Sequence, residues 1–192
     1  MRKRACIALL AAVACTGVAF ADFSPLWFEV EPNGSIAEAI ANNFIGSAAP
    51  GGSGTAIEGY LDSGDVDWYA FAVEDEAYIG AAAFDQDGVG ADAQFQLIDE
   101  FGTIIEWDDD DGIGFMPSLE ANIPAGTYLL GVSAYPDVTS STGLTELFDG
   151  MTSTGEPTEA DFAYKVSIVT NVVPEPASLL MLSLGLFLFR RR

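Results

Sequence analysis

The chain has 192 residues and a formal net charge of −22, with 29 acidic side chains against seven lysines and arginines. Six of the seven bases lie at the ends, within residues 2–4 and 190–192, so Lys165 is the only base between Asp22 and Pro174. That segment holds 28 of the 29 acids and has a net charge of −27. Such a surface repels nucleic acid and anionic lipid, which excludes nucleic acid as a partner.

Histidine is absent, and both cysteines, Cys6 and Cys15, lie in the apolar N-terminal stretch. Without that stretch the body has no disulfide, no thiol nucleophile and no histidine or cysteine to bind a metal. An enzyme built on it would depend on carboxylates, as glycosidases do. Acids are so numerous that pairing two of them has no discriminating value, and we expect a protein that is not an enzyme.

Residues 1–21 are typical of a secretory signal peptide, with a basic start, an apolar middle and Ala19-Phe20-Ala21 at the end. Small residues at Ala19 and Ala21 fit the requirement of signal peptidase. A lipoprotein signal at Cys15 is the alternative, but Ala12 stands where a larger aliphatic residue is usual. The sequence predicts export through the inner membrane and cleavage after Ala21.

A short helix is expected early in the exported body. Ser35 and Glu38 have the spacing of a capping box, in which the serine caps the first turn. The helix is predicted to end near Asn43. Residues 45–55, rich in glycine and serine, are interpreted as a flexible connector.

Eight short runs with the composition of β-strands lie in the body, separated by turn residues such as Asp62-Ser63-Gly64. They cover residues 56–61, 66–73, 78–84, 93–98, 103–107, 118–123, 127–134 and 162–170. Because the strands are many and short and no long helical pattern interrupts them, residues 22–171 are predicted to form one all-β domain. We expect an antiparallel β-sandwich or jelly roll.

Alternation along residues 66–73 places Tyr69, Phe71 and Val73 on one side and Trp68 on the other. If the first three face the core, Trp68 points outward, where it could stack on a sugar or a protein partner. The alternative is that a neighbouring loop covers Trp68.

Residues 137–161 form a long connection with many polar and acidic side chains. Its apolar residues are spaced as on one or two turns of an amphipathic helix; they are Leu144, Leu147, Phe148 and Met151. We interpret the connection as a surface insertion that packs its apolar side on the sandwich, with a partner-binding loop as the alternative.

Four motifs in this order resemble the bacterial pre-peptidase C-terminal domain, a jelly-roll β-sandwich. They are Glu29-Val30-Glu31-Pro32-Asn33, Gly64 to Phe71, Ala125 to Tyr128, and Tyr164-Lys165-Val166. The resemblance covers residues 29–170, although no peptidase is attached and the 137–161 insertion is longer than expected.

The resemblance implies a calcium site with oxygen ligands from Glu29, Glu31, Asn33 and Asp67, and less directly from Asp65. Alternate residues of an extended segment share a side, so the first three can converge, and calcium prefers six to eight oxygen ligands. The alternative is that these acids are solvated turn residues or helix caps.

Two further acidic clusters, Asp108 to Asp111 and Asp85-Gln86-Asp87-Gly88 with Asp92, do not fit the calcium loop of an EF-hand. In the best register of the first, Ile113 occupies a ligand position, and the flanking segments are predicted strands where an EF-hand requires helices. Solvated loops are the favoured interpretation.

The tail, residues 172–192, combines Val173-Pro174-Glu175-Pro176, an apolar run over 177–189 and the terminal bases Arg190, Arg191 and Arg192. As a helix the run would extend about 20 Å, short of the roughly 30 Å of a bilayer core. The whole pattern resembles a PEP-CTERM sorting signal, which implies recognition by an exosortase near the Pro-Glu-Pro. A simple short membrane anchor is the alternative.

The leading hypothesis is therefore an exported, non-catalytic protein of the cell surface or extracellular matrix, stabilised by calcium, and anchored in the membrane before exosortase processing. The alternative is a module that binds exopolysaccharide or a surface protein, with Trp68, Trp107 and the 137–161 connection as candidate contacts. A carboxylate-based hydrolase ranks last.

Overall fold

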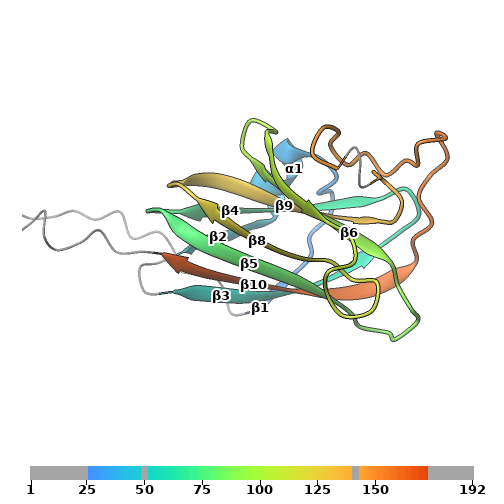
Figure 1. Ribbon diagram of the computed structural model, residues 1–192, viewed down its shortest axis with the longest axis horizontal. Coiled ribbons are helices and arrows are strands. Elements are labelled where there is room, and N and C mark those ends of the chain that lie inside the picture. The colour runs from blue at the N-terminus through green and yellow to red at the C-terminus, as the bar shows by residue number, and fades with distance from the viewer. Residues whose placement is uncertain (1–25, 49–51, 140–142, 173–192) are drawn as a thin grey trace, which may run out of the picture.

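The computed structural model describes residues 26–48, 52–139 and 143–172. The elements in chain order are β1 (Leu26–Phe28), α1 (Ile36–Asn42), β2 (Phe44–Ala48), β3 (Ser53–Leu61), β4 (Val66–Val73), β5 (Ala77–Asp85), β6 (Ala93–Asp99), β7 (Ile104–Asp108), β8 (Ser118–Ile123), β9 (Gly126–Ala134) and β10 (Phe162–Val172). They form two five-stranded sheets, β1-β3-β10-β5-β8 and β2-β4-β9-β6-β7, which face each other (Figure 1). The predicted all-β sandwich with one short N-terminal helix is confirmed.

The predicted signal peptide and the tail from Val173 onward, with its expected hydrophobic helix, lie outside the described residues. Within the described ranges, the structure contains no helix that is both long and apolar enough to cross a membrane.

All eight predicted strands are present. The predicted bounds 66–73 and 118–123 coincide with β4 and β8, and the other ends differ by at most three residues. Ser35 caps the helix as predicted, because the Glu38 N–H donates to Ser35 Oγ at 3.3 Å. The Glu38 carboxylate in turn accepts from that hydroxyl at 2.7 Å.

Two strands, β1 and β2, fall outside the predicted set, and both pair in parallel with their neighbours, β3 and β4. The sheets are therefore mixed rather than wholly antiparallel. The interpretation of residues 45–55 as a flexible connector is wrong for β2, where Ser47 and Ala48 are buried and pair with Ala72 and Val73. Small side chains allow this close packing, whereas in composition alone they are typical of a linker.

The main core lies between the sheets, where Tyr69, Phe71 and Val73 of β4 face residues such as Ile57 and Tyr164 of the opposite sheet. The predicted orientation of β4 is thus correct. Both faces of β4 are buried, and among its eight residues Ala72 alone is half-buried.

A second apolar cluster lies on the outer side of the β2-β4-β9-β6-β7 sheet, where α1 and the 143–161 connection both lie (Figure 1). Trp68 is only 2% exposed and packs on Phe148, with ring centroids 6.1 Å apart. The hypothesis that Trp68 is an exposed ligand contact is therefore wrong. Phe148 belongs to the long connection, so the alternative that a neighbouring loop covers Trp68 is correct. Trp107 is half-buried against the same cluster.

Two buried glutamines of β6 hold the connection in place. Gln94 accepts from the N–H groups of Asp137 and Val138, while Gln96 accepts from Phe148 N–H and donates to the Gly143 and Glu146 carbonyls. Both side chains are fully buried.

The expected helical turn is absent from residues 143–161, which form turns, bends and an isolated bridge. Three backbone groups that would take part in the hydrogen bonds of a helix are bonded to the Gln96 side chain instead. Phe148 is buried, whereas Leu144 and Leu147 are exposed. Over residues 143–161 the connection therefore contacts the cluster through Phe148 rather than through a helical face.

Candidate metal centre

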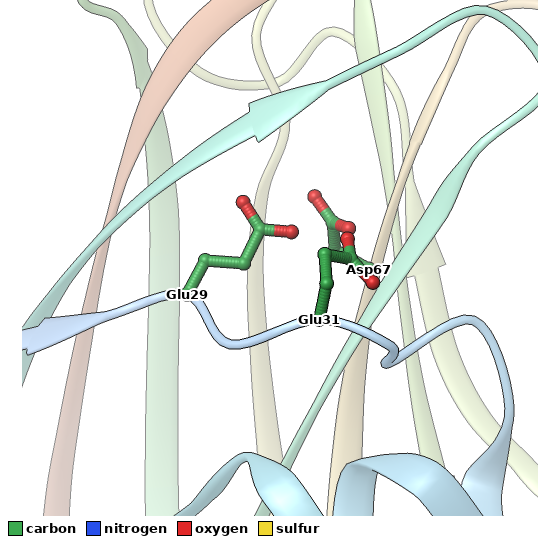
Figure 2. A group of neighbouring side chains, drawn as sticks. All are labelled: Glu29, Glu31 and Asp67. Carbon is green, nitrogen blue, oxygen red and sulfur yellow. The ribbon is translucent and has the colours of Figure 1, made fainter.

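Three carboxylates meet at the start of the fold, where the chain leaves β1 and passes β4. One oxygen from each of Glu29, Glu31 and Asp67 lies within 4.8 Å of the other two. In Figure 2, Glu29 and Glu31 extend from the segment after β1 toward Asp67 on β4. The convergence predicted from alternation in an extended segment is therefore present.

The first two carboxylates are oriented by backbone donors. The Tyr60 N–H donates to Glu29 Oε2 at 2.7 Å, and the Asn33 N–H donates to Glu31 Oε2 at 2.9 Å. Burial, a hydrogen bond with Glu29 and the charge of Asp65 raise the pKa of Glu31 to about 7. Like charges held this close favour either a proton or a cation between them.

Asn33 ties the segment to β4. It is fully buried, its amide donates to Glu29 Oε1 at 3.0 Å, and its carbonyl accepts from the Trp68 N–H at 3.2 Å. Its side-chain oxygen, Oδ1, is buried and has no hydrogen-bond partner among the described residues. A buried acceptor without a donor is uncommon, because desolvating it costs about 1–3 kcal/mol.

Asp67 is the innermost acid and is fully buried. Tyr164 Oη donates to its Oδ2 at 2.5 Å, whereas Oδ1 is buried without a partner within the described part of the chain. Burial, and then the neighbouring Glu29 carboxyl, raise the pKa of Asp67 well above its usual value, and the Tyr164 hydrogen bond opposes this shift.

Asp65 does not join the group whose oxygens converge. One of its oxygens accepts from the Val66 N–H at 2.9 Å, in the turn that precedes β4. Burial raises its pKa, and it influences Glu31 through charge. Asp65 therefore lies beside the candidate site and does not contribute one of the converging oxygens.

The donor set suits calcium. Three carboxylates and one amide oxygen supply hard oxygen ligands, and the two buried acceptors without donors are the oxygens that a cation would satisfy. An ion held by Glu29, Glu31, Asn33 and Asp67 would neutralise their mutual repulsion, with water completing six to eight ligands.

The other two acidic clusters are organised differently. Both oxygens of Asp85 are taken by backbone N–H groups, those of Asp87, Gly88, Gly90 and Ala91. Asp108 Oδ2 accepts from the N–H groups of Asp111 and Ser118. In the described ranges, Glu29, Glu31 and Asp67 form the one group in which three potential ligand atoms come together.

The sequence did not point to Tyr69, Tyr164 or Tyr60 as parts of this site. Tyr69 follows Asp67 by two residues and so shares its side, which was a usable indication. The meeting of Asp67 with Tyr164 depends on which strands face each other across the sandwich, and no local pattern records that.

Solved structures similar to the chain share low sequence identity with it. The pre-peptidase C-terminal domain of a collagenase from Bacillus anthracis is 20% identical, with a TM-score of 0.42, over 66% of this chain and 92% of that one. A periplasmic inhibitor of g-type lysozyme from Aeromonas hydrophila is 15% identical, with a TM-score of 0.36, over 65% and 94%. A mitogen from Yersinia pseudotuberculosis is 10% identical, with a TM-score of 0.35, over 66% and 90%.

A comparison with curated proteins finds no match. The tail gives a clear result: residues 172–192 match the model of the PEP-CTERM protein-sorting motif, as the sequence predicts. The chain is thus an exported protein that carries the sorting motif recognised by an exosortase and is anchored in the membrane before that enzyme acts.

Proposed function

We propose that the chain, once sorted, serves at the cell surface or in the extracellular matrix as a non-catalytic module that bound calcium stabilises. The observation that carries the proposal is the convergence of Glu29, Glu31 and Asp67 beside two buried oxygens without donors. Calcium there would cross-link the segment after β1 to β4 and so fix the N-terminal part of the body to the sandwich.

Thermal unfolding of the full-length protein in detergent, with excess calcium or with EDTA, tests this proposal. At a calcium concentration 100 times the dissociation constant, the ion stabilises the fold by about 2.7 kcal/mol, which raises the Tm by about 5–10 °C. Glu31→Gln should reduce the rise. The matched control is Glu100→Gln, at an exposed turn, which should keep it. Equal Tm values in calcium and EDTA would contradict calcium stabilisation.

A second candidate role is binding of a neutral exopolysaccharide by the open face of the β1-β3-β10-β5-β8 sheet. Phe28, Glu58, Lys165 and Phe84 are consecutive cross-strand neighbours on four adjacent strands. Both phenylalanines are exposed, and Lys165 Nζ lies 2.6 Å from Glu58 Oε1, so the row carries no net charge. Exposed rings in a row without net charge can stack on sugar rings, whereas the acidic body repels anionic polymers.

Co-sedimentation with a neutral exopolysaccharide from the native host distinguishes this role. Phe28→Ala and Phe84→Ala should each weaken binding. Phe101→Ala, which removes an even more exposed ring in a turn on the other sheet, should leave it unchanged. Equal binding by all three variants would exclude this face as the polysaccharide-binding site.

A further inference from the structure

The Asp67 carboxylate ends a hydrogen-bonded chain of two buried tyrosines, Tyr164 from the opposite sheet and Tyr69 from β4 itself. Tyr164, on β10, donates from its hydroxyl to Asp67 Oδ2 at 2.5 Å. Its hydroxyl also lies 2.5 Å from that of Tyr69, the β4 residue two positions after Asp67. Both tyrosines are fully buried. The chain Tyr69–Tyr164–Asp67 therefore links the centre of the core to the candidate metal site.

The direction of these hydrogen bonds follows from the groups involved. An ionised carboxylate only accepts, so the single hydroxyl proton of Tyr164 is directed at Asp67 when a cation is bound. The Tyr164 oxygen can then only accept from Tyr69. In this relay of hydrogen bonds, Tyr69 donates to Tyr164 and Tyr164 donates to Asp67 Oδ2. Asp67 Oδ1, which is buried without a donor among the described residues, is left for a bond to the metal.

Space for this relay is provided at Gly59 on β3. A Cβ atom there would lie 2.5 Å from Tyr164 Oη and 2.8 Å from Tyr69 Oη. Real Cβ atoms do not approach other atoms so closely, so any larger residue would displace the two hydroxyls. The backbone of β3 is therefore shaped to admit both phenol groups side by side.

We propose that Tyr164 is a positioning residue of the calcium site, held in turn by Tyr69, and that it restricts Asp67 to a single coordinating oxygen. This inference rests on the proposed calcium function. Partners that orient a metal ligand typically contribute about 10–100-fold to metal affinity.

Calorimetric titration of the full-length protein in detergent with calcium chloride at neutral pH tests the role. Tyr164→Phe removes one hydroxyl and should weaken calcium binding about 10–100-fold. Tyr69→Phe should weaken it less, and the double variant should bind no more weakly than Tyr164→Phe, because Tyr69 acts through Tyr164. Tyr128→Phe is the control, since that hydroxyl donates to the Pro124 carbonyl; its affinity should equal that of the wild type.

A spectroscopic measurement separates positioning from general stability. Calcium should change the near-ultraviolet absorption of the tyrosines in the wild type and in Tyr128→Phe, and the change should be smaller in Tyr69→Phe. If Tyr164→Phe does not fold, Tyr69→Phe decides by both readouts, and wild-type values in both would overturn the proposal.

Failure of the calcium function and failure of the tyrosine role give different results. A wild-type protein that neither binds calcium nor gains stability from it would refute the calcium function itself. A wild type that binds calcium, with a folded Tyr164→Phe that binds it equally well, would refute only the role of the tyrosines.

Discussion

The backbone N–H of Phe148 donates to the side-chain oxygen of Gln96 at 3.2 Å, inside the second apolar cluster. The same glutamine donates to the Gly143 and Glu146 carbonyls. A single side chain on β6 therefore fixes three backbone groups of the long connection, and the buried ring of Phe148 follows from them.

Gln96→Leu should destabilise the protein strongly, because three backbone groups of the connection lose their partner. We expect the free energy of unfolding to fall by about 2–5 kcal/mol. Urea denaturation measures the loss, and Gln86→Leu, at an exposed position, should change the value by less than about 0.5 kcal/mol. Unchanged hydrogen-exchange protection of the Phe148 amide in Gln96→Leu would contradict the prediction.

Trp68→Ala should reduce stability rather than ligand binding, since Trp68 is buried against Phe148. Removing a buried aromatic side chain costs about 3–5 kcal/mol. Chemical denaturation provides the measurement. Phe101→Ala is the control, because its ring is 85% exposed and should contribute little. A Trp68→Ala variant as stable as the wild type would mean that the connection does not cover the sheet.

Gly131→Ala tests the close packing beneath Trp68. A Cβ atom at Gly131 would lie 2.5 Å from Trp68 Cζ3, whereas at Gly80 the nearest atom, Val169 Cγ2, is 3.4 Å away. We expect a loss of about 1–3 kcal/mol for Gly131→Ala, as for other overpacked positions. Gly80→Ala should fall well below that range in the same thermal-unfolding measurement. Equal losses in the two variants would contradict the prediction.

The calcium-free protein should lose stability as the pH rises from about 4.5 to about 7. Burial, a hydrogen bond with Glu29 and the charge of Asp65 raise the pKa of Glu31 from 4.5 to about 7 in the folded state. The folded protein therefore binds this proton more tightly than the unfolded chain, and the resulting stabilisation, complete below pH 4.5, is lost across that interval. Denaturation midpoints should fall with pH in the wild type and less in Glu31→Gln.

Calcium affinity should rise over the same pH interval, because the ion has to displace the bound proton. Titrations between pH 5 and pH 7.5 measure this effect. A calcium affinity that stays constant from pH 5 to pH 7.5 would argue against Glu31 as a ligand.

Processing of the tail can be read from the intact mass of the protein recovered from its native host. Cleavage of the signal peptide after Ala21 predicts a chain that starts at Asp22. Exosortase cleavage near the Pro-Glu-Pro predicts that it ends between Val173 and Pro176. A mass that includes Arg192 would instead indicate that the tail is retained.

The side chains of β4 that face the core were predictable, because alternate residues of a strand point to opposite sides of the sheet. The convergence of Glu29, Glu31 and Asn33 was predictable for the same reason, because they alternate along one extended segment. Asp67 was assigned through the resemblance to a known domain, and one of its oxygens lies within 4.8 Å of oxygens of Glu29 and Glu31.

Features that depend on pairing between distant segments could not be predicted. β2 resembled a linker because Gly46, Ser47 and Ala48 are small, yet its burial comes from β4. Gln96 would be assigned to a solvated face by polarity alone, although the connection encloses it. The side of the strand on which Trp68 lies was predicted correctly, but its cover was supplied by Phe148, eighty residues further along the chain.

The position of β10 determines how force would enter the molecule. β10 is the central strand of its sheet and is paired over nine residues with β3 on one side and nine with β5 on the other. The chain continues from its end toward the sorting tail. Ladder hydrogen bonds run perpendicular to antiparallel strands, so a pull along β10 loads both ladders in shear, with many bonds sharing the force. A protein tethered by this end would resist traction far better than one held by an edge strand, whose bonds can open one at a time.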